Sequence, residues 1–105
     1  MSDAAKPLPY VVTYSDRVRE KLLTLADEAR LRGDGASFAA AVREFDNRLR
    51  VYPQFGDPLW DLNEYEGHIR LGIVPPLAMR YGVFEKTRQV FVVANPVLLA
   101  KAGAC

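Results

Sequence analysis

Two stretches with an apolar stripe at helical spacing follow each other in the first half of the chain, and they constrain its fold more than any other feature. Ser15 or Asp16 offers an N-cap oxygen to the first helix, and Ser37 offers one to the second. Pro53 stops the second helix, and the short connection between the two predicts an antiparallel hairpin. The stripes occupy residues 16–33 (Val18, Leu22, Leu25, Ala26 and Ala29) and 37–52 (Phe38, Ala41, Val42, Phe45, Leu49 and Tyr52).

Most of the remaining apolar sequence has the composition and the two-residue period of β-strands. One such segment precedes the helices, and three follow them, joined by turns at Pro75-Pro76 and at residues 85–88. An N-terminal strand, a helix hairpin and a three-stranded antiparallel meander predict an α+β fold with both helices on one face of the sheet. The strands are expected at residues 10–15, 68–74, 77–84 and 89–94.

The chain of 105 residues has the length of a single domain, which we place at residues 10–95. Residues 1–9 contain two prolines and no periodicity, so we expect a flexible N-terminal tail. Residues 96–105 carry no strong signal, and we expect a C-terminal tail or a short helix there.

The segment between the second helix and the meander, residues 53–66, predicts a turn-rich connection. Trp60 and Tyr65 in this segment either cover the core or offer flat surfaces on which nucleic-acid bases could stack. The side chains expected to hold the connection against the domain are Phe55, Leu59, Trp60 and Leu62.

Composition limits the kinds of site and partner. The one cysteine, Cys105, excludes an intrachain disulfide, and without a Cys/His cluster we expect neither a structural metal nor a cofactor. No signal peptide is evident, and no apolar run approaches the roughly 18 residues of a membrane span, so we expect a cytoplasmic protein. Residues 66–105 carry five Lys/Arg against two Asp/Glu, a net charge of +3, which permits a polyanionic partner without requiring one.

Side chains alternate along the second and third predicted strands, and this alternation separates apolar from charged residues. Burying each large apolar side chain against the helices contributes about 1.5–3 kcal/mol. An unpaired arginine on that side would cost more than it gains. We therefore expect His68, Arg70 and Arg80 to share the open face, with Gly72 and Gly82 between them. The sets expected to face the helices are Ile69, Leu71 and Ile73, and Leu77, Met79, Tyr81 and Val83.

This group of His68, Arg70 and Arg80 has two interpretations. As a catalytic centre, the two guanidinium groups would stabilise phosphate charge and His68 would transfer protons, because an imidazole can titrate near neutral pH. As ordinary surface residues, the arginines would be solvated or paired with an acidic residue nearby: Glu64, Glu66 or Glu85.

Several strings along the chain match a known pattern, above all HIRLG followed by RYGVFEKTRQVFVV. VTYSDRVREKL near the N-terminus and FDNRLRVYPQFG at the end of the second helix match it too. With the order of the elements, they make residues 10–94 resemble the RelE/ParE superfamily of bacterial type II toxin–antitoxin toxins. The resemblance implies a compact toxin fold, a cognate antitoxin that wraps it, and a target that is either mRNA on the ribosome, which such toxins cleave, or DNA gyrase.

The resemblance also bears on the site. RNA-cleaving members of the superfamily use basic residues on the open sheet face and no metal, and His68 and Arg70 fall on two of those positions. Ala78 stands where these members carry an arginine, and residues 94–105 contain neither the Arg nor the Tyr that follow their last strand. Arg80, two residues beyond Ala78, is expected on the same face, about 7 Å further along the strand.

Three functions remain open from the sequence. The resemblance implies a toxin-like protein that acts on mRNA, the ribosome or gyrase; an RNA-cleaving one would be a metal-independent endoribonuclease that uses His68, Arg70 and Arg80. The unmatched positions favour a catalytically inactive binding or regulatory module of the same fold. An interaction domain unrelated to toxins, which binds a partner by adding a strand or a helix, is the third.

Overall fold

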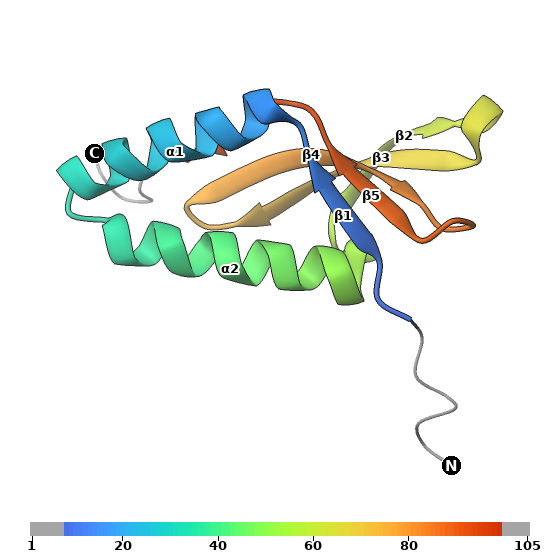
Figure 1. The fold of residues 1–105 in the computed structure, drawn as a ribbon, viewed down its shortest axis with the longest axis horizontal. Coiled ribbons are helices and arrows are strands. Elements are labelled where there is room, and N and C mark those ends of the chain that lie inside the picture. Colours follow the sequence, from blue (N-terminus) through green and yellow to red (C-terminus); the bar gives the residue numbers. More distant parts are fainter. Residues whose placement is uncertain (1–7, 100–105) are drawn as a thin grey trace, which may run out of the picture.

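The computed structural model describes residues 8–99, in which a helix hairpin packs against one face of a mixed six-stranded sheet (Figure 1). The predicted α+β class and the order of strand, two helices and antiparallel meander are confirmed. The helices are α1 (Asp16–Leu31) and α2 (Gly35–Val51), and short 3-10 helices cover Pro53–Phe55 and Asn63–Tyr65. The strands are β1 (Val11–Tyr14), β2 (Asp57–Leu62), β3 (Gly67–Val74), β4 (Leu77–Phe84), β5 (Gln89–Val92) and β6 (Val97–Leu98).

Local capping sets the ends of the helices. Ser15 caps α1, and its Oγ accepts a hydrogen bond from the backbone nitrogen of Val18 at 3.2 Å. Gly33 follows α1 with a φ of 82°, a left-handed conformation that glycine adopts without strain. Because Asp34 is already the N-cap of α2, the prediction that Ser37 caps this helix is wrong.

The sheet has the order β1-β5-β4-β3-β2, with β6 beside β4. Strands β3, β4 and β5 form the antiparallel meander, while β1 pairs in parallel with β5. The first strand of the domain therefore lies beside a strand from its far end, and the two edges of the main sheet are β1 and β2.

Two short strands lie where the sequence predicts none. β2 lies inside the expected connection, where Pro58 and the two aspartates of the segment mask its alternation, and pairing with β3 holds it in the sheet. β6 lies in the expected C-terminal tail, and the next residue, Leu99, donates its backbone N–H to the carbonyl of Pro76 at 2.7 Å. The tail assignments for residues 1–7 and 100–105 fall outside the described part of the chain.

The core lies between the hairpin and the sheet, and Gly72 allows the two layers to meet closely. A Cβ at this position would lie 2.7 Å from Phe45 Cζ and 2.8 Å from Phe55 Cζ. The predicted stripe of α2 ends at Leu49, since Tyr52 is 59% exposed. The helices bury Val18, Leu25, Ala29, Phe38, Ala41, Phe45 and Leu49, and the strands bury Val74, Leu77, Met79, Tyr81, Val83, Val90 and Val92.

Candidate functional site

The pairing of β3 with β4 decides which side chains share a face of the sheet. A two-residue turn joins the strands, so odd-numbered residues of β3 lie opposite even-numbered residues of β4. Directly opposed residues of an antiparallel pair project to the same side. Arg70 therefore shares a side with Tyr81, and Leu71 shares a side with Arg80.

The expectation that His68, Arg70 and Arg80 share the open face is wrong. Tyr81 and Val83 belong to the core under the helices, so their partners Arg70 and His68 lie on the helix side. Arg80 projects from the opposite side and is exposed. The prediction assigned the all-apolar set of each strand to the helices separately, but pairing the strands sends the two sets to opposite sides.

The guanidinium of Arg70 is bound to the loop between α2 and β2. Its Nη1 donates to the carbonyl oxygens of Gln54 at 3.0 Å and Gly56 at 2.5 Å. The neighbouring Tyr81 hydroxyl donates to the carbonyl of Pro53 at 2.6 Å and accepts from the backbone N–H of Gly56 at 3.1 Å. These contacts hold the loop on the sheet. Arg70 therefore binds backbone carbonyls, whereas one expectation was an ion pair between Arg70 and a glutamate.

His68 lies in a row with Asp61 of β2 and Val83 of β4, also on the helix side. The residue is half-buried, and its Nε2 is closed off from solvent with no hydrogen-bond partner among residues 8–99. Because His68 and Arg80 project from opposite sides of the sheet, a single phosphate group cannot contact both.

The open face carries a row of side chains that crosses five strands. From β2 to β1, the successive partners in this row are Trp60, Ile69, Gly82, Phe91 and Thr13. The adjacent row contains Asp57, Leu71 and Arg80. Trp60 is 51% exposed and Ile73 is 45% exposed, so residues expected in the core or covering it instead present apolar surface to solvent.

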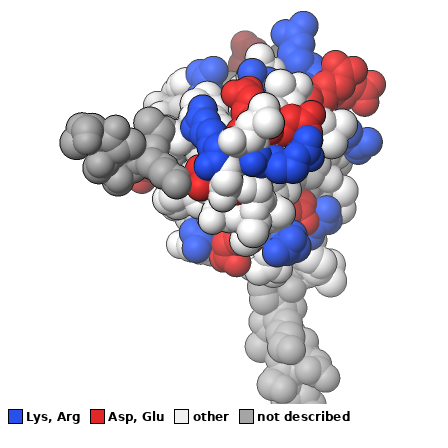
Figure 2. Space-filling view, turned by 90° about the vertical axis from the view of Figure 1, so that its left-hand side faces the viewer, with Lys and Arg blue, Asp and Glu red and all other residues white. Residues whose placement is uncertain are grey.

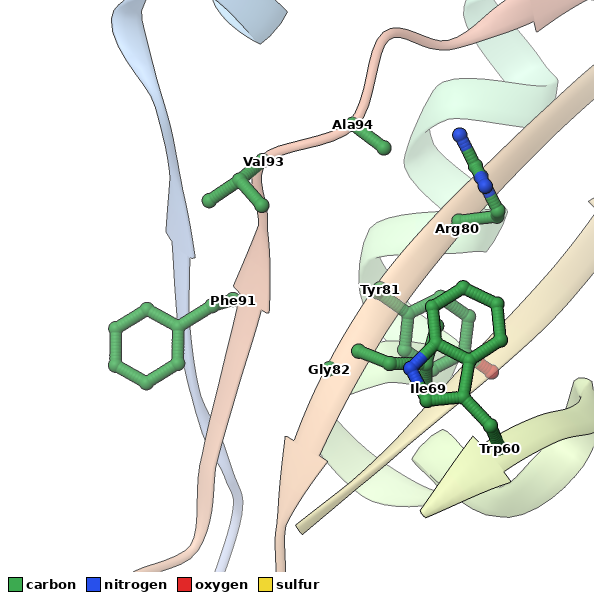
Figure 3. Close-up of a pocket in the computed structure, with 8 residues that line it drawn as sticks. All are labelled: Trp60, Ile69, Arg80, Tyr81, Gly82, Phe91, Val93 and Ala94. Carbon is green, nitrogen blue, oxygen red and sulfur yellow. The ribbon is translucent and has the colours of Figure 1, made fainter. Parts of the chain in front are cut away.

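A hollow of about 250 Å³ opens on this face beside Arg80 (Figure 3). Gly82 contributes no side chain, while Trp60 and Arg80 stand on one side of it and Phe91 and Val93 on the other. The complete lining is Trp60, Ile69, Arg80, Tyr81, Gly82, Phe91, Val93 and Ala94.

A break in strand pairing, between β5 and β6, borders this hollow. β4 pairs with β5 as far as Gly82 opposite Phe91, and it pairs with β6 from Ala78 opposite Val97. Between these two pairs lie three residues of β4 but five residues of the facing chain, an excess of two. The facing chain therefore leaves the sheet between β5 and β6, and Val93, directly after β5, is 66% exposed.

Arg80 is the one cation that lines the hollow, and it makes no ion pair or hydrogen bond within residues 8–99. Exposed Arg43 lies on α2, away from the sheet face. At the end of the molecule where α1 meets α2, Lys and Arg side chains are mixed with Asp and Glu (Figure 2). Neither surface has the concentrated positive charge that tight phosphate-backbone binding requires.

Two of the three glutamates expected as partners for the arginines bind other side chains. Glu66 pairs with Lys86 at 3.1 Å, and Glu85 accepts a hydrogen bond from Gln54 at 2.9 Å. The side chain of Tyr65, the second candidate stacking residue, falls outside the described part of the structure.

A second polar cluster joins β1 to α2 on the helix side. The Tyr14 hydroxyl donates to Asp46 Oδ1 at 2.6 Å, and Arg50 Nε donates to Asp46 Oδ2 at 2.8 Å. Burial, followed by the bond to Asp46, raises the pKa of Tyr14 above its ordinary value. Partial burial alone would raise the pKa of Asp46, but the hydrogen bonds from Arg50 and Tyr14 lower it. These hydrogen bonds join β1 to α2, so we assign the cluster to stability.

The sequence analysis did not identify Phe91 and Val93 as surface residues of this face. The two-residue turn at Pro75-Pro76 was a usable signal for the register of β3 against β4, and so for the sides of Arg70 and Arg80. Within residues 8–99, no group of three or more His, Cys, Asp or Glu side chains is placed to hold a metal ion. No helix in the same range is long and apolar enough to cross a membrane. Comparisons with protein-family models, with curated proteins and with solved structures find no match.

Proposed function

We propose that this chain is a toxin-like, cytoplasmic component of a bacterial type II toxin–antitoxin pair that acts by binding a protein partner through its open sheet face. The resemblance of residues 10–94 to RelE/ParE toxins supports the first part, and the element order agrees with it. One observation carries the second part: the open face is an apolar surface with a hollow beside Arg80, which has no partner within residues 8–99. The implied partners are a cognate antitoxin and, as target, gyrase or the ribosome.

The geometry favours binding over RNA cleavage. Stabilising a phosphate transition state requires charged groups within contact distance of the same phosphate, and small misplacements lose most of the rate. Arg70 is bound to loop carbonyls on the helix side, while Arg80 projects from the other side. Ala78 and residues 94–105 also lack side chains that RNA-cleaving members of the superfamily use.

Induction of the chain alone in bacteria tests the proposal. We expect slower growth without accumulation of cleaved mRNA, and loss of the effect in Arg80→Glu but not in Arg43→Glu, an equal charge change on α2. A gyrase supercoiling assay and a ribosome sedimentation assay would identify the target. Growth inhibition that depends on His68, accompanied by mRNA cleavage, would instead assign an endoribonuclease.

A catalytically inactive regulatory module is the second candidate, and the commitment of Arg70 to the loop favours it. It predicts normal growth on induction together with a stable complex when the chain is co-expressed with the neighbouring reading frame. Normal growth without any complex would exclude both candidates.

A further inference from the structure

The hollow on the open face combines apolar walls with a single charge. Its floor is the gap at Gly82, where the row of cross-strand partners lacks a side chain, and Ile69 and Phe91 flank this gap. Trp60 and Arg80 stand together along one side (Figure 3). The arrangement is shaped for a ligand group that is apolar at its tip and negatively charged beside it.

We propose that this hollow receives an apolar side chain from an acidic partner segment, and that a neighbouring Asp or Glu of that segment binds Arg80. The inference rests on the proposed use of the open face and specifies the chemistry of the partner. The tip of a Leu, Met or Phe side chain is the expected occupant, and the guanidinium holds the carboxylate at the rim.

The apolar part follows from exposure. Trp60 is 51% exposed and Val93 is 66% exposed, so both leave apolar surface in water that a bound side chain would cover. Tryptophan and arginine are also the residues that most often dominate binding energy when they surround a pocket of this kind.

The acidic part follows from charge. Arg80 is the cation that lines the hollow, and it has no partner within residues 8–99. A carboxylate can accept two parallel hydrogen bonds from a guanidinium, and apolar neighbours that exclude water strengthen such a pair.

A phosphate backbone fits this surface less well. Asp57 lies two strands from Arg80 in the same row, about 10 Å away, and would repel a chain of phosphates that runs across the face. A nucleic acid would also need several cations, and Arg80 is the one that lines the hollow. An acidic protein segment needs a single cation on this face.

Selection from a random peptide library displayed on phage, with the full chain as bait, tests this inference. We expect the selected peptides to share an acidic residue within a few positions of a large apolar residue. Trp60 is the sole tryptophan, so binding of a synthetic winning peptide that lacks tryptophan can be followed by its fluorescence.

Three variants make the test specific. Arg80→Glu should weaken the winning peptide by about tenfold or more, and a peptide with Lys in place of the acidic residue should bind this variant better than it binds the original chain. Arg43→Glu should change little. Gly82→Ala should also weaken binding while the fold is kept, because the added methyl fills the floor at an ordinary contact distance of 3.4 Å from Ile69 Cδ1.

The inference is overturned if no peptide is selected, if the winners lack the acidic residue, or if Arg80→Glu and Arg43→Glu have equal effects. Single-stranded RNA that quenches Trp60 in an Arg80-dependent way, without any peptide binding, would assign the face to nucleic acid instead. Peptide binding by a chain that does not impair growth would retain this docking site and reject the toxin-like function. Growth inhibition without peptide binding would retain the toxin-like function and reject this docking site.

Discussion

At the scale of single residues, Arg70 carries its charge on the helix-covered side of the sheet and pairs with no carboxylate of residues 8–99. Two backbone carbonyls of the loop that follows α2 accept its hydrogen bonds, and Tyr81 binds the same loop. Hydrogen bonds from a charged donor stabilise more than those between neutral groups, because the charge strengthens each bond. The residue is therefore part of the scaffold that fixes the loop between α2 and β2.

Replacing Arg70 by Met tests this role, since it keeps the aliphatic stem and removes the two bonds to Gln54 and Gly56. We expect the free energy of unfolding to fall by about 1.5–3 kcal/mol, as measured by urea denaturation. Arg80→Met is the matched control and should change it by no more than about 0.5 kcal/mol. Equal losses in both variants would mean that the loop contacts of Arg70 do not stabilise the fold.

Tyr81 makes stability depend on pH at the alkaline end. Burial raises its pKa to about 12 in the folded chain, against about 10 in an unfolded chain. The folded state keeps the proton longer, so this contribution is fully present below about pH 10 and is lost as the pH rises towards about 12. Tyr81→Phe should therefore show a shallower fall of the urea midpoint between about pH 10 and 12 than the original chain. The part of the fall due to Tyr14, whose pKa is also raised, should persist. An unchanged slope in Tyr81→Phe would contradict the prediction.

At the scale of secondary-structure elements, two glycines on adjacent strands have different tasks. Gly72 of β3 lies under the helices, where Phe45 and Phe55 occupy the space that a Cβ would need. Gly82 of β4 lies on the open face, where its missing side chain leaves a hollow. The first is required for packing the layers, and the second shapes the surface.

Alanine at each position separates these tasks. Gly72→Ala places a methyl group 2.7 Å from Phe45 Cζ, and we expect a loss of stability of about 1–3 kcal/mol from overpacking. Gly82→Ala meets its nearest atoms at 3.4 Å and should cost well under about 1 kcal/mol. Thermal unfolding of the two variants side by side is the measurement, and a more damaging Gly82→Ala would refute this assignment of layers.

The β3–β4 hairpin also explains why the residues of the site predicted from the sequence lie on opposite sides of the sheet. The positions of both strands and of the turn were predictable from period and from Pro75-Pro76. Their relative register follows from the length of the turn, and it places Arg70 and Arg80 on opposite sides. The alternation within one strand does not give the phase of the neighbouring strand. The pattern of each strand taken alone therefore does not predict that the two arginines lie on opposite sides.

At the scale of the whole molecule, charge limits the affinity for nucleic acid. The chain carries a net charge of +1, and the described ion pairs neutralise several of its cations. Each phosphate that a protein neutralises adds about 0.7 to the salt slope for a single strand. Because Arg80 is the one cation lining the hollow among the described residues, we expect a slope no steeper than about −1 for single-stranded RNA.

Fluorescence anisotropy with a labelled RNA oligonucleotide at several salt concentrations measures this slope. Arg80→Glu should abolish binding of the RNA oligonucleotide, whereas Arg43→Glu should weaken it less. A slope steeper than about −3 would reveal a phosphate-binding surface that the open face does not account for.

The sequence by itself determined the two helices and four of the six strands, because helical and strand periods are local properties of neighbouring residues. It determined the α+β class too, since two helical stripes are followed by a run of strand segments, and a sheet beside a helix hairpin buries the apolar sides of both. Only the tertiary structure decided which face each charged residue occupies, because a one-residue change of phase between strands reverses every side chain. It also added β2 and β6, whose stability comes from pairing with distant strands, and it turned a predicted His68–Arg70–Arg80 centre into an apolar hollow with Arg80 alone at its rim.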